Sequence, residues 1–222
     1  MNCQPAKLLA IKREVEFRHY MESPENFVFS GLLYTKDEHD TVSPVKNFPD
    51  KLYLRETLMA MHESSIFFIP KSRQIMATWL CCAYALWTAM FRPYQSVLVQ
   101  SKNEINSAML VFTQKMDMAR ISFLYSYLPE WLKDRVRVVT SFAKLSFSNG
   151  SWILGVPEGG DIVRQYTASM VLCDEAGFQT AFESAYTAAK PMAKKIVAVS
   201  TMNPGFFAEV CMETCMSALR PD

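Results

Sequence analysis

Short apolar runs alternate along this chain with longer segments in which apolar residues recur every three or four positions. The runs have the length of buried strands, and the longer segments have the spacing of helices. Strands separated by helices pair in parallel, with helices on both faces of the sheet, so the alternation predicts an α/β fold. The predicted strands lie at 65–69, 96–101, 136–140, 169–176 and 195–205, the last ending in a loop, and the predicted helices at 5–22, 78–91, 102–119 and 182–193.

Two other segments have different patterns. Residues 23–50 are rich in proline and polar residues, which predicts loops. Residues 144–156 read as a hairpin, because Asn149-Gly150 is a preferred pair for a two-residue turn.

Composition excludes several classes of protein. The formal net charge of +1 over 222 residues argues against a protein that coats nucleic acid, although a local basic strip is compatible with it. The longest apolar run, 79–91, is shorter than the about 20 residues of a membrane span, so we expect a buried helix and no membrane partner. The six cysteines have no metal-binding spacing, which favours reduced thiols.

The stretch 66–87 has the layout of a phosphate-binding loop. An apolar strand stops at Pro70, a polar loop follows, and a long apolar helix begins near Thr78. In the general pattern GxxxxGK[ST], backbone amides hold the phosphates, Lys reaches the outer ones and Ser/Thr holds Mg²⁺. With Thr78 as the last residue, Ala77 stands where Lys is usual, Met76 where Gly is usual, and Lys71 comes first. A long side chain from Lys71 can still reach the same phosphates, and a solvated loop cation is the alternative.

Two acids, Asp174 and Glu175, follow a buried strand directly. Ligands of open α/β sheets bind at the carboxyl ends of strands. There the first acid can hold Mg²⁺, and the second can orient the water that attacks a γ-phosphate. The alternative is a polar turn after a strand. Ser200, Thr201 and Asn203 follow the next predicted strand and could meet the acids at the same edge, or simply cap that strand.

A family resemblance joins these motifs. The stretch "PKSRQIMATWLCCAYALW" resembles the ATPase motif of the large subunit of viral terminases, in the subgroup whose motif starts with Lys. Lys71, Ser72, Arg73, Gln74 and Thr78 match that subgroup, whereas Met76 departs from its usual glycine.

The resemblance extends along the chain. "VLCDEAGF" resembles the family's Walker B acids, and "STMNPG" resembles its coupling motif. Arg164 precedes Glu175 by eleven residues, as does an Arg that reaches a neighbouring subunit's γ-phosphate in the family; flanking a mobile loop is the alternative for Arg164. Arg55 occupies the place of a common Gln in the adenine-side segment.

The resemblance implies a P-loop NTPase of the ASCE/RecA-like type with ATP and Mg²⁺ as cofactors. Its function would be to drive double-stranded viral DNA into procapsids in the host cytoplasm, transiently at the portal vertex. The implied partners are the portal protein, the small terminase subunit and a homo-oligomeric ring on the portal, with a monomer as the alternative in isolation. The implied nucleotide-binding residues are Lys71, Ser72, Arg73, Gln74, Ala77, Thr78 and Arg55; Thr78 and Asp174 would hold the metal, Glu175, Arg164 and Arg73 would be catalytic, and Ser200, Thr201 and Asn203 would couple hydrolysis to movement.

We expect an N-terminal arm at 1–48 packed on the core, an ATPase core at 49–205, and the start of a linker at 206–222 towards a nuclease domain that is absent, hence no nuclease activity. Two alternative functions remain open at this point. One is a degenerate nucleotide-binding or assembly module without efficient hydrolysis, and the other is a helicase-like DNA translocase.

Overall fold

The computed structural model describes residues 4–37, 40–72 and 75–218, and its centre is a seven-stranded sheet. The strand order is β3-β9-β8-β4-β7-β6-β5. The pairs from β3 to β7 are parallel, and β6 and β5 are antiparallel. The prediction of a mainly parallel α/β fold is therefore confirmed. The strands are β3 (Ile66–Pro70), β4 (Ser96–Ser101), β5 (Val138–Ser141), β6 (Lys144–Phe147), β7 (Trp152–Pro157), β8 (Met170–Asp174) and β9 (Ile196–Ser200).

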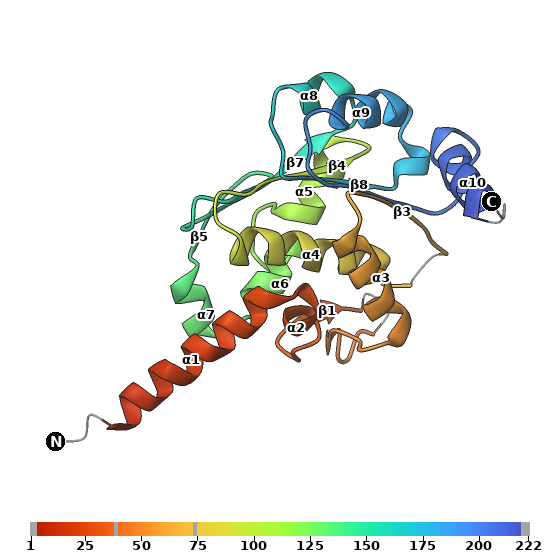
Figure 1. Ribbon diagram of the computed structural model, residues 1–222. Helices are drawn as coiled ribbons and strands as arrows, with labels where there is room; N and C mark the ends of the chain where they lie inside the picture. Colours follow the sequence, from red (N-terminus) through yellow and green to blue (C-terminus); the bar gives the residue numbers. More distant parts are fainter. Residues whose placement is uncertain (1–3, 38–39, 73–74, 219–222) are drawn as a thin grey trace.

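Helices cover both faces of this sheet. In Figure 1, α8 (Gly160–Arg164), α9 (Phe182–Ala189) and α10 (Phe206–Ala218) lie above it, whereas the helices from α3 to α6 lie below. Alternate strand residues supply the two cores, with Val97 and Val99 in the lower one and Leu98 in the upper one. The lower helices are α3 (Leu52–Glu63), α4 (Ala77–Phe91), α5 (Glu104–Val111) and α6 (Arg120–Ser126), and α7 (Glu130–Arg135) follows near β5.

The central elements are apolar on every side because they are buried on every side. All residues of β8 and β9 are buried, which is typical of inner parallel strands. Helix α4 is almost entirely buried between the sheet and the N-terminal elements, and this explains its continuous apolar sequence. No helix in the described part of the chain is long and apolar enough to cross a membrane.

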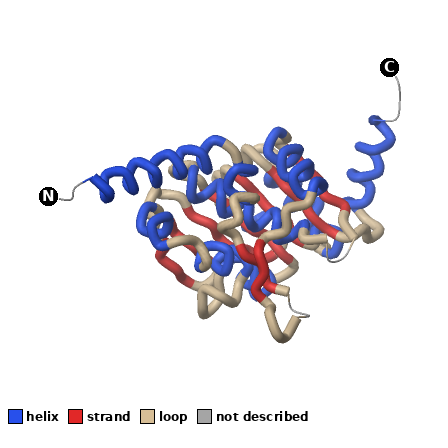
Figure 2. Tube along the Cα trace, turned by 90° about the horizontal axis from the view of Figure 1, so that it is seen from below, coloured by secondary structure: helices blue, strands red, loops and turns tan. Residues whose placement is uncertain are grey.

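The N-terminal elements pack against α4. They are α1 (Gln4–Glu22), α2 (Pro24–Val28) and a small antiparallel pair, β1 (Tyr34–Lys36) and β2 (Val45–Asn47). Phe27 is fully buried, and its ring centroid lies 4.9 Å from that of Phe91. The chain ends lie on opposite sides of the molecule, with α1 and α10 leading towards them (Figure 2).

Three local predictions were wrong in detail. The segment 23–50 contains α2, β1 and β2 besides loops. The helix predicted over 102–119 ends at Val111, since Phe112 is extended and buried in the lower core. The hairpin turn has three residues rather than two, because Phe147 donates its N–H to the Ser151 carbonyl. Gly150, at φ +83°, takes the left-handed position that such a loop needs.

Candidate functional site: a cleft at the carboxyl ends of three parallel strands

The carboxyl ends of β3, β9 and β8 lie side by side, with β9 in the middle. Lys71, directly after β3, donates its backbone N–H to the Ser200 carbonyl at 2.9 Å. This arrangement brings the phosphate-loop candidate and the two acids to one cleft of about 650 Å³. The residues that line this cleft are Thr35, Lys36, Asp37, Lys46, Asn47, Pro49, Lys71, Ile75, Met76, Ala77, Thr78, Trp79, Arg120, Asp174 and Glu175.

Lys71 forms an ion pair across this cleft. Its Nζ lies 2.9 Å from Glu175 Oε1, and its side chain is only 10% exposed. The Lys71 ammonium is therefore directed into the site rather than into solvent, which argues against a solvated loop cation. A carboxylate is the partner that this ammonium takes in the absence of phosphate oxygens.

Thr78 and Asp174 form the second contact between the loop and the acids. Thr78 Oγ1 donates a hydrogen bond of 2.9 Å to Asp174 Oδ1. Burial raises the pKa of Asp174, while the Thr78 hydrogen bond and the positive charge of Arg120 oppose that rise. A hydroxyl and a carboxylate are hard oxygen ligands of the kind that Mg²⁺ prefers, so this pair fits the expected ion.

The described residues contain no group of three or more His, Cys, Asp or Glu side chains that could hold a metal. This is compatible with Mg²⁺, which usually binds to one or two protein oxygens together with waters and substrate phosphates.

The backbone of the loop explains why glycine is usual at position 76. Met76 has φ +62°, in the left-handed region that favours glycine, and it precedes the first residue of α4. From there the amides at the start of α4, including that of Ala77, face the cleft end of the helix, where anions are stabilised. Ser72 is an exposed loop residue, and the predicted site residues Arg73 and Gln74 lie outside the described residues.

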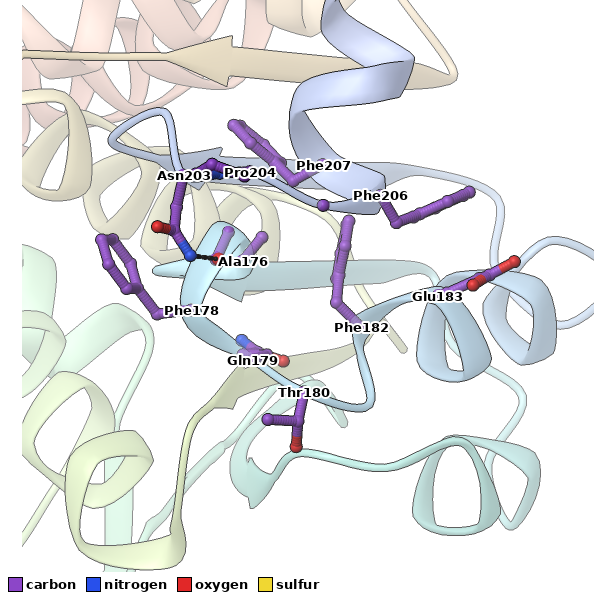
Figure 3. Close-up of a pocket in the computed structure, with 12 residues that line it drawn as sticks. Ala176, Phe178, Gln179, Thr180, Phe182, Glu183, Asn203, Pro204, Phe206 and Phe207 are labelled. Carbon is purple, nitrogen blue, oxygen red and sulfur yellow. Dashed lines mark hydrogen bonds between the residues drawn. The ribbon is translucent and has the colours of Figure 1, made fainter.

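The predicted coupling segment contacts the loop that follows the acids. Ser200 Oγ donates to Glu175 Oε2 at 3.4 Å, and Asn203 Nδ2 donates to the Gly177 carbonyl at 2.9 Å (Figure 3). Gly177 fits tightly here, because a Cβ at that position would lie 3.1 Å from both Ser200 Oγ and the Thr201 carbonyl oxygen. A shift of the 200–203 segment would therefore move the loop that carries Glu175.

Two predicted site arginines lie away from the cleft lining. Arg55 is held by Asp50 and Glu25, with Nε 2.6 Å from Asp50 Oδ1 and Nη1 2.6 Å from Glu25 Oε1, so the structure does not bring it to the cleft. Arg164 is exposed on α8 and forms an ion pair of 2.9 Å with Asp161. An exposed position is compatible with the expected action on a neighbouring subunit.

The structure adds cleft residues that the sequence patterns did not indicate. The β1–β2 pair forms one wall, although its sequence reads as a loop. Arg120 forms another part of the wall, and nothing in its local sequence distinguishes it from an ordinary surface arginine. Both come from segments far from the phosphate-loop motif, so only tertiary contacts reveal them.

Comparison with known protein families agrees with this arrangement. The family model described as "Terminase large subunit, T4likevirus-type, N-terminal" matches residues 68–210. No curated protein matches the chain in sequence.

Among solved structures, the ATPase domain of the large terminase of Thermus phage P74-26 is similar at a TM-score of 0.45 and 13% identity, over 72% of this chain and 68% of that one. The large terminase of a second, thermophilic bacteriophage is similar at a TM-score of 0.47 and 16% identity, over 71% of this chain and 39% of that one. This second terminase has also been solved in complex with ADP, and in that form it is similar at a TM-score of 0.43 and 14% identity, over 63% of this chain and 34% of that one.

Proposed function

The chain belongs to the terminase large-subunit family, and on that premise we propose that it is an ATPase motor that moves double-stranded viral DNA into procapsids. The observation that carries the proposal is the double contact between the phosphate-loop candidate and the Walker B acids. Lys71 meets Glu175, and Thr78 meets Asp174, in one cleft.

In this proposal the nucleotide takes over the Lys71 ammonium. The phosphates of ATP carry more negative charge than one carboxylate, so Lys71 turns from Glu175 to the phosphate oxygens. That exchange releases Glu175, which is then available to orient and deprotonate the attacking water. The ion pair thus keeps the base occupied until substrate arrives.

Thr78 and Asp174 would hold Mg²⁺, which neutralises charge on the phosphates when it is bound. The chain's own contribution is to keep these two oxygens adjacent. The hydrogen bond between them sets their separation, and the limited exposure of Asp174 restricts competing water.

The 200–203 segment would transmit the state of the site. Ser200 contacts the catalytic carboxylate itself, and Asn203 holds the loop that follows it. When Glu175 moves from Lys71 to water, the hydrogen bond from Ser200 must change as well. Ser200 and Asn203 are therefore proposed as positioning residues that link hydrolysis to movement.

The remaining assignments follow from the family. We assign a ring of subunits on the portal, with the small terminase subunit and DNA as further partners, in the host cytoplasm. Exposed Arg164 would reach a neighbouring subunit's site, and such arginines are worth about 10³ to 10⁵ in rate. An isolated monomer would then hydrolyse ATP slowly. Residues 1–48 would serve as an arm, 49–205 as the ATPase core, and 206–222 as the start of a linker.

A second candidate is a module that binds nucleotide without hydrolysing it efficiently. The left-handed Met76 favours it, because a side chain stands where the family usually has glycine close to the phosphates. Ala77 also leaves the usual lysine position without a cation.

Two measurements separate the candidates: nucleotide binding and phosphate release, with and without DNA and portal. The motor proposal expects DNA- and portal-stimulated release that Lys71→Ala abolishes, whereas Lys12→Ala, on exposed α1, leaves it unchanged. Binding without release under any of these conditions supports the inert module. A Lys71→Ala protein that hydrolyses ATP at the parental rate contradicts the assignment of Lys71.

A further inference from the structure

Arg120 is held at the wall of the cleft by the residues on either side of it. It is the first residue of α6, and its neighbours Ala119 and Ile121 are 1% and 0% exposed. Helix α6 packs on α4, the helix that begins at the phosphate-loop candidate. The backbone of Arg120 is therefore fixed relative to the loop, while its side chain is free to extend into the cleft.

Arg120 faces both acids from two sides. It lines the main cleft, and it also lines an adjoining cleft of about 380 Å³ that reaches Ser101, Lys102 and Asn106. Asp174 and Glu175 are the other residues common to both clefts. Arg120 thus stands beside the two carboxylates, at the boundary between the two spaces.

The guanidinium of Arg120 has donors to spare. It lies 5.8 Å from the centroid of the Trp79 ring, and it forms no hydrogen bond or ion pair with any residue that the structure describes. Arg55 is different, since two carboxylates occupy its donors. A planar guanidinium with open donors is well suited to phosphate oxygens.

The balance of charge gives this cation a role. Lys71 is close enough to neutralise Glu175, and Thr78 supplies only a neutral hydroxyl to Asp174. A triphosphate in this cleft would meet two carboxylates, so cations besides Lys71 are needed to stabilise it. Arg120 is placed next to those acids, where the proposed reaction occurs.

We propose that Arg120 is a catalytic residue that donates hydrogen bonds, within its own subunit, to the terminal phosphate of a bound nucleoside triphosphate. The inference rests on the proposed function of the cleft and adds a contact to it. The terminal phosphate is specified because Arg120 accompanies the two acids in both clefts. Trp79 acts as the positioning residue, with its ring beside the guanidinium.

The test is calorimetric titration of the purified chain with Mg²⁺ and either a non-hydrolysable ATP analogue or ADP. Arg120→Gln removes the charge, Arg120→Lys keeps it, and Arg137→Gln removes one from an exposed position beside β5 as a control. We expect Arg120→Gln to weaken binding of the ATP analogue about tenfold or more, since charge-assisted hydrogen bonds to phosphate are lost. ADP binding should change by less than about threefold, because ADP lacks the group that Arg120 contacts. Arg120→Lys should recover part of the loss.

Each other outcome has a definite meaning. Equal losses for the ATP analogue and ADP overturn the assignment to the terminal phosphate. Unchanged binding in Arg120→Gln, together with lost binding in Lys71→Ala, overturns the role of Arg120 and leaves the proposed function standing. If the parental chain binds neither nucleotide, the proposed function of the cleft fails and this inference fails with it.

Discussion

The Lys71 ammonium lies 2.9 Å from the Glu175 carboxylate, although the two residues are 104 positions apart in sequence. This contact holds the start of the phosphate-loop candidate against the end of the Walker B strand. It also means that the proposed catalytic base is neutralised when no nucleotide is bound. The following predictions depend on this contact and on its neighbours.

Replacing Glu175 by Gln should separate binding from turnover. Loss of the base should reduce phosphate release by about 100-fold or more. Nucleotide affinity should be kept or increased, because Gln no longer competes as a charged partner for Lys71. The measurements are phosphate release and binding of a fluorescent nucleotide, and Glu183→Gln, an exposed acid on α9, is the control. A Glu175→Gln protein with parental turnover would remove Glu175 from the mechanism.

Thr78 should contribute to both stability and metal dependence. In Thr78→Val the Asp174 carboxylate loses its hydrogen-bond donor while remaining 7% exposed, so the free energy of unfolding should fall by about 1–3 kcal/mol. Nucleotide binding should also lose its dependence on Mg²⁺. Thr78→Ser keeps the hydroxyl and serves as the matched control. Urea unfolding and Mg²⁺ titrations measure the two effects, and equal behaviour of Val and Ser would contradict the prediction.

Met76 should tolerate glycine and reject a β-branched residue. At φ +62° the strain is relieved by glycine, whereas Met76→Val should lower the free energy of unfolding by about 1–2 kcal/mol. Met76→Gly should stay within about 1 kcal/mol of the parent, since relief of strain offsets the greater flexibility of the unfolded chain. Urea unfolding tests both. Met118→Val, at an exposed methionine without positive φ, controls for the change of side chain.

Ser200 should affect turnover more than stability. Ser200→Ala removes the 3.4 Å contact to Glu175 Oε2, so phosphate release should fall by about tenfold while the free energy of unfolding changes by about 1 kcal/mol at most. Ser122→Ala is a matched control, since Ser122 is equally buried but its hydroxyl bonds only to the Ala119 carbonyl. Parallel losses of turnover in both variants would indicate a general packing effect instead.

His62 should make stability depend on pH. Burial, followed by the charge of Lys195, lowers the pKa of His62 below its usual 6.5. The unfolded chain then binds the proton more readily, so this stability is fully present above pH 6.5 and is lost as pH falls towards the folded-state pKa. Thermal unfolding between pH 7.5 and pH 5 should show a smaller decline for His62→Gln than for the parent. His19→Gln, on exposed α1, should retain the parental decline.

Local patterns predicted much of the fold. The alternation of strands and helices appeared where expected, because a short apolar run or a helical spacing depends on neighbouring residues only. The prediction for 102–119 was too long, since burial of Phe112 in the core outweighed the helical pattern. The β1–β2 pair was missed because three-residue strands carry almost no periodic signal.

The sequence by itself determined the α/β class, the phosphate-loop candidate with Lys71 at its start, and the acids at the end of a buried strand. Only the tertiary structure decided that β9 separates β3 from β8, that Lys71 pairs with Glu175, and that Arg120 enters the cleft while Arg55 does not. The physical reason is distance along the chain. Element type follows from short-range patterns, whereas the partners of a charged side chain follow from contacts between segments that no local pattern relates.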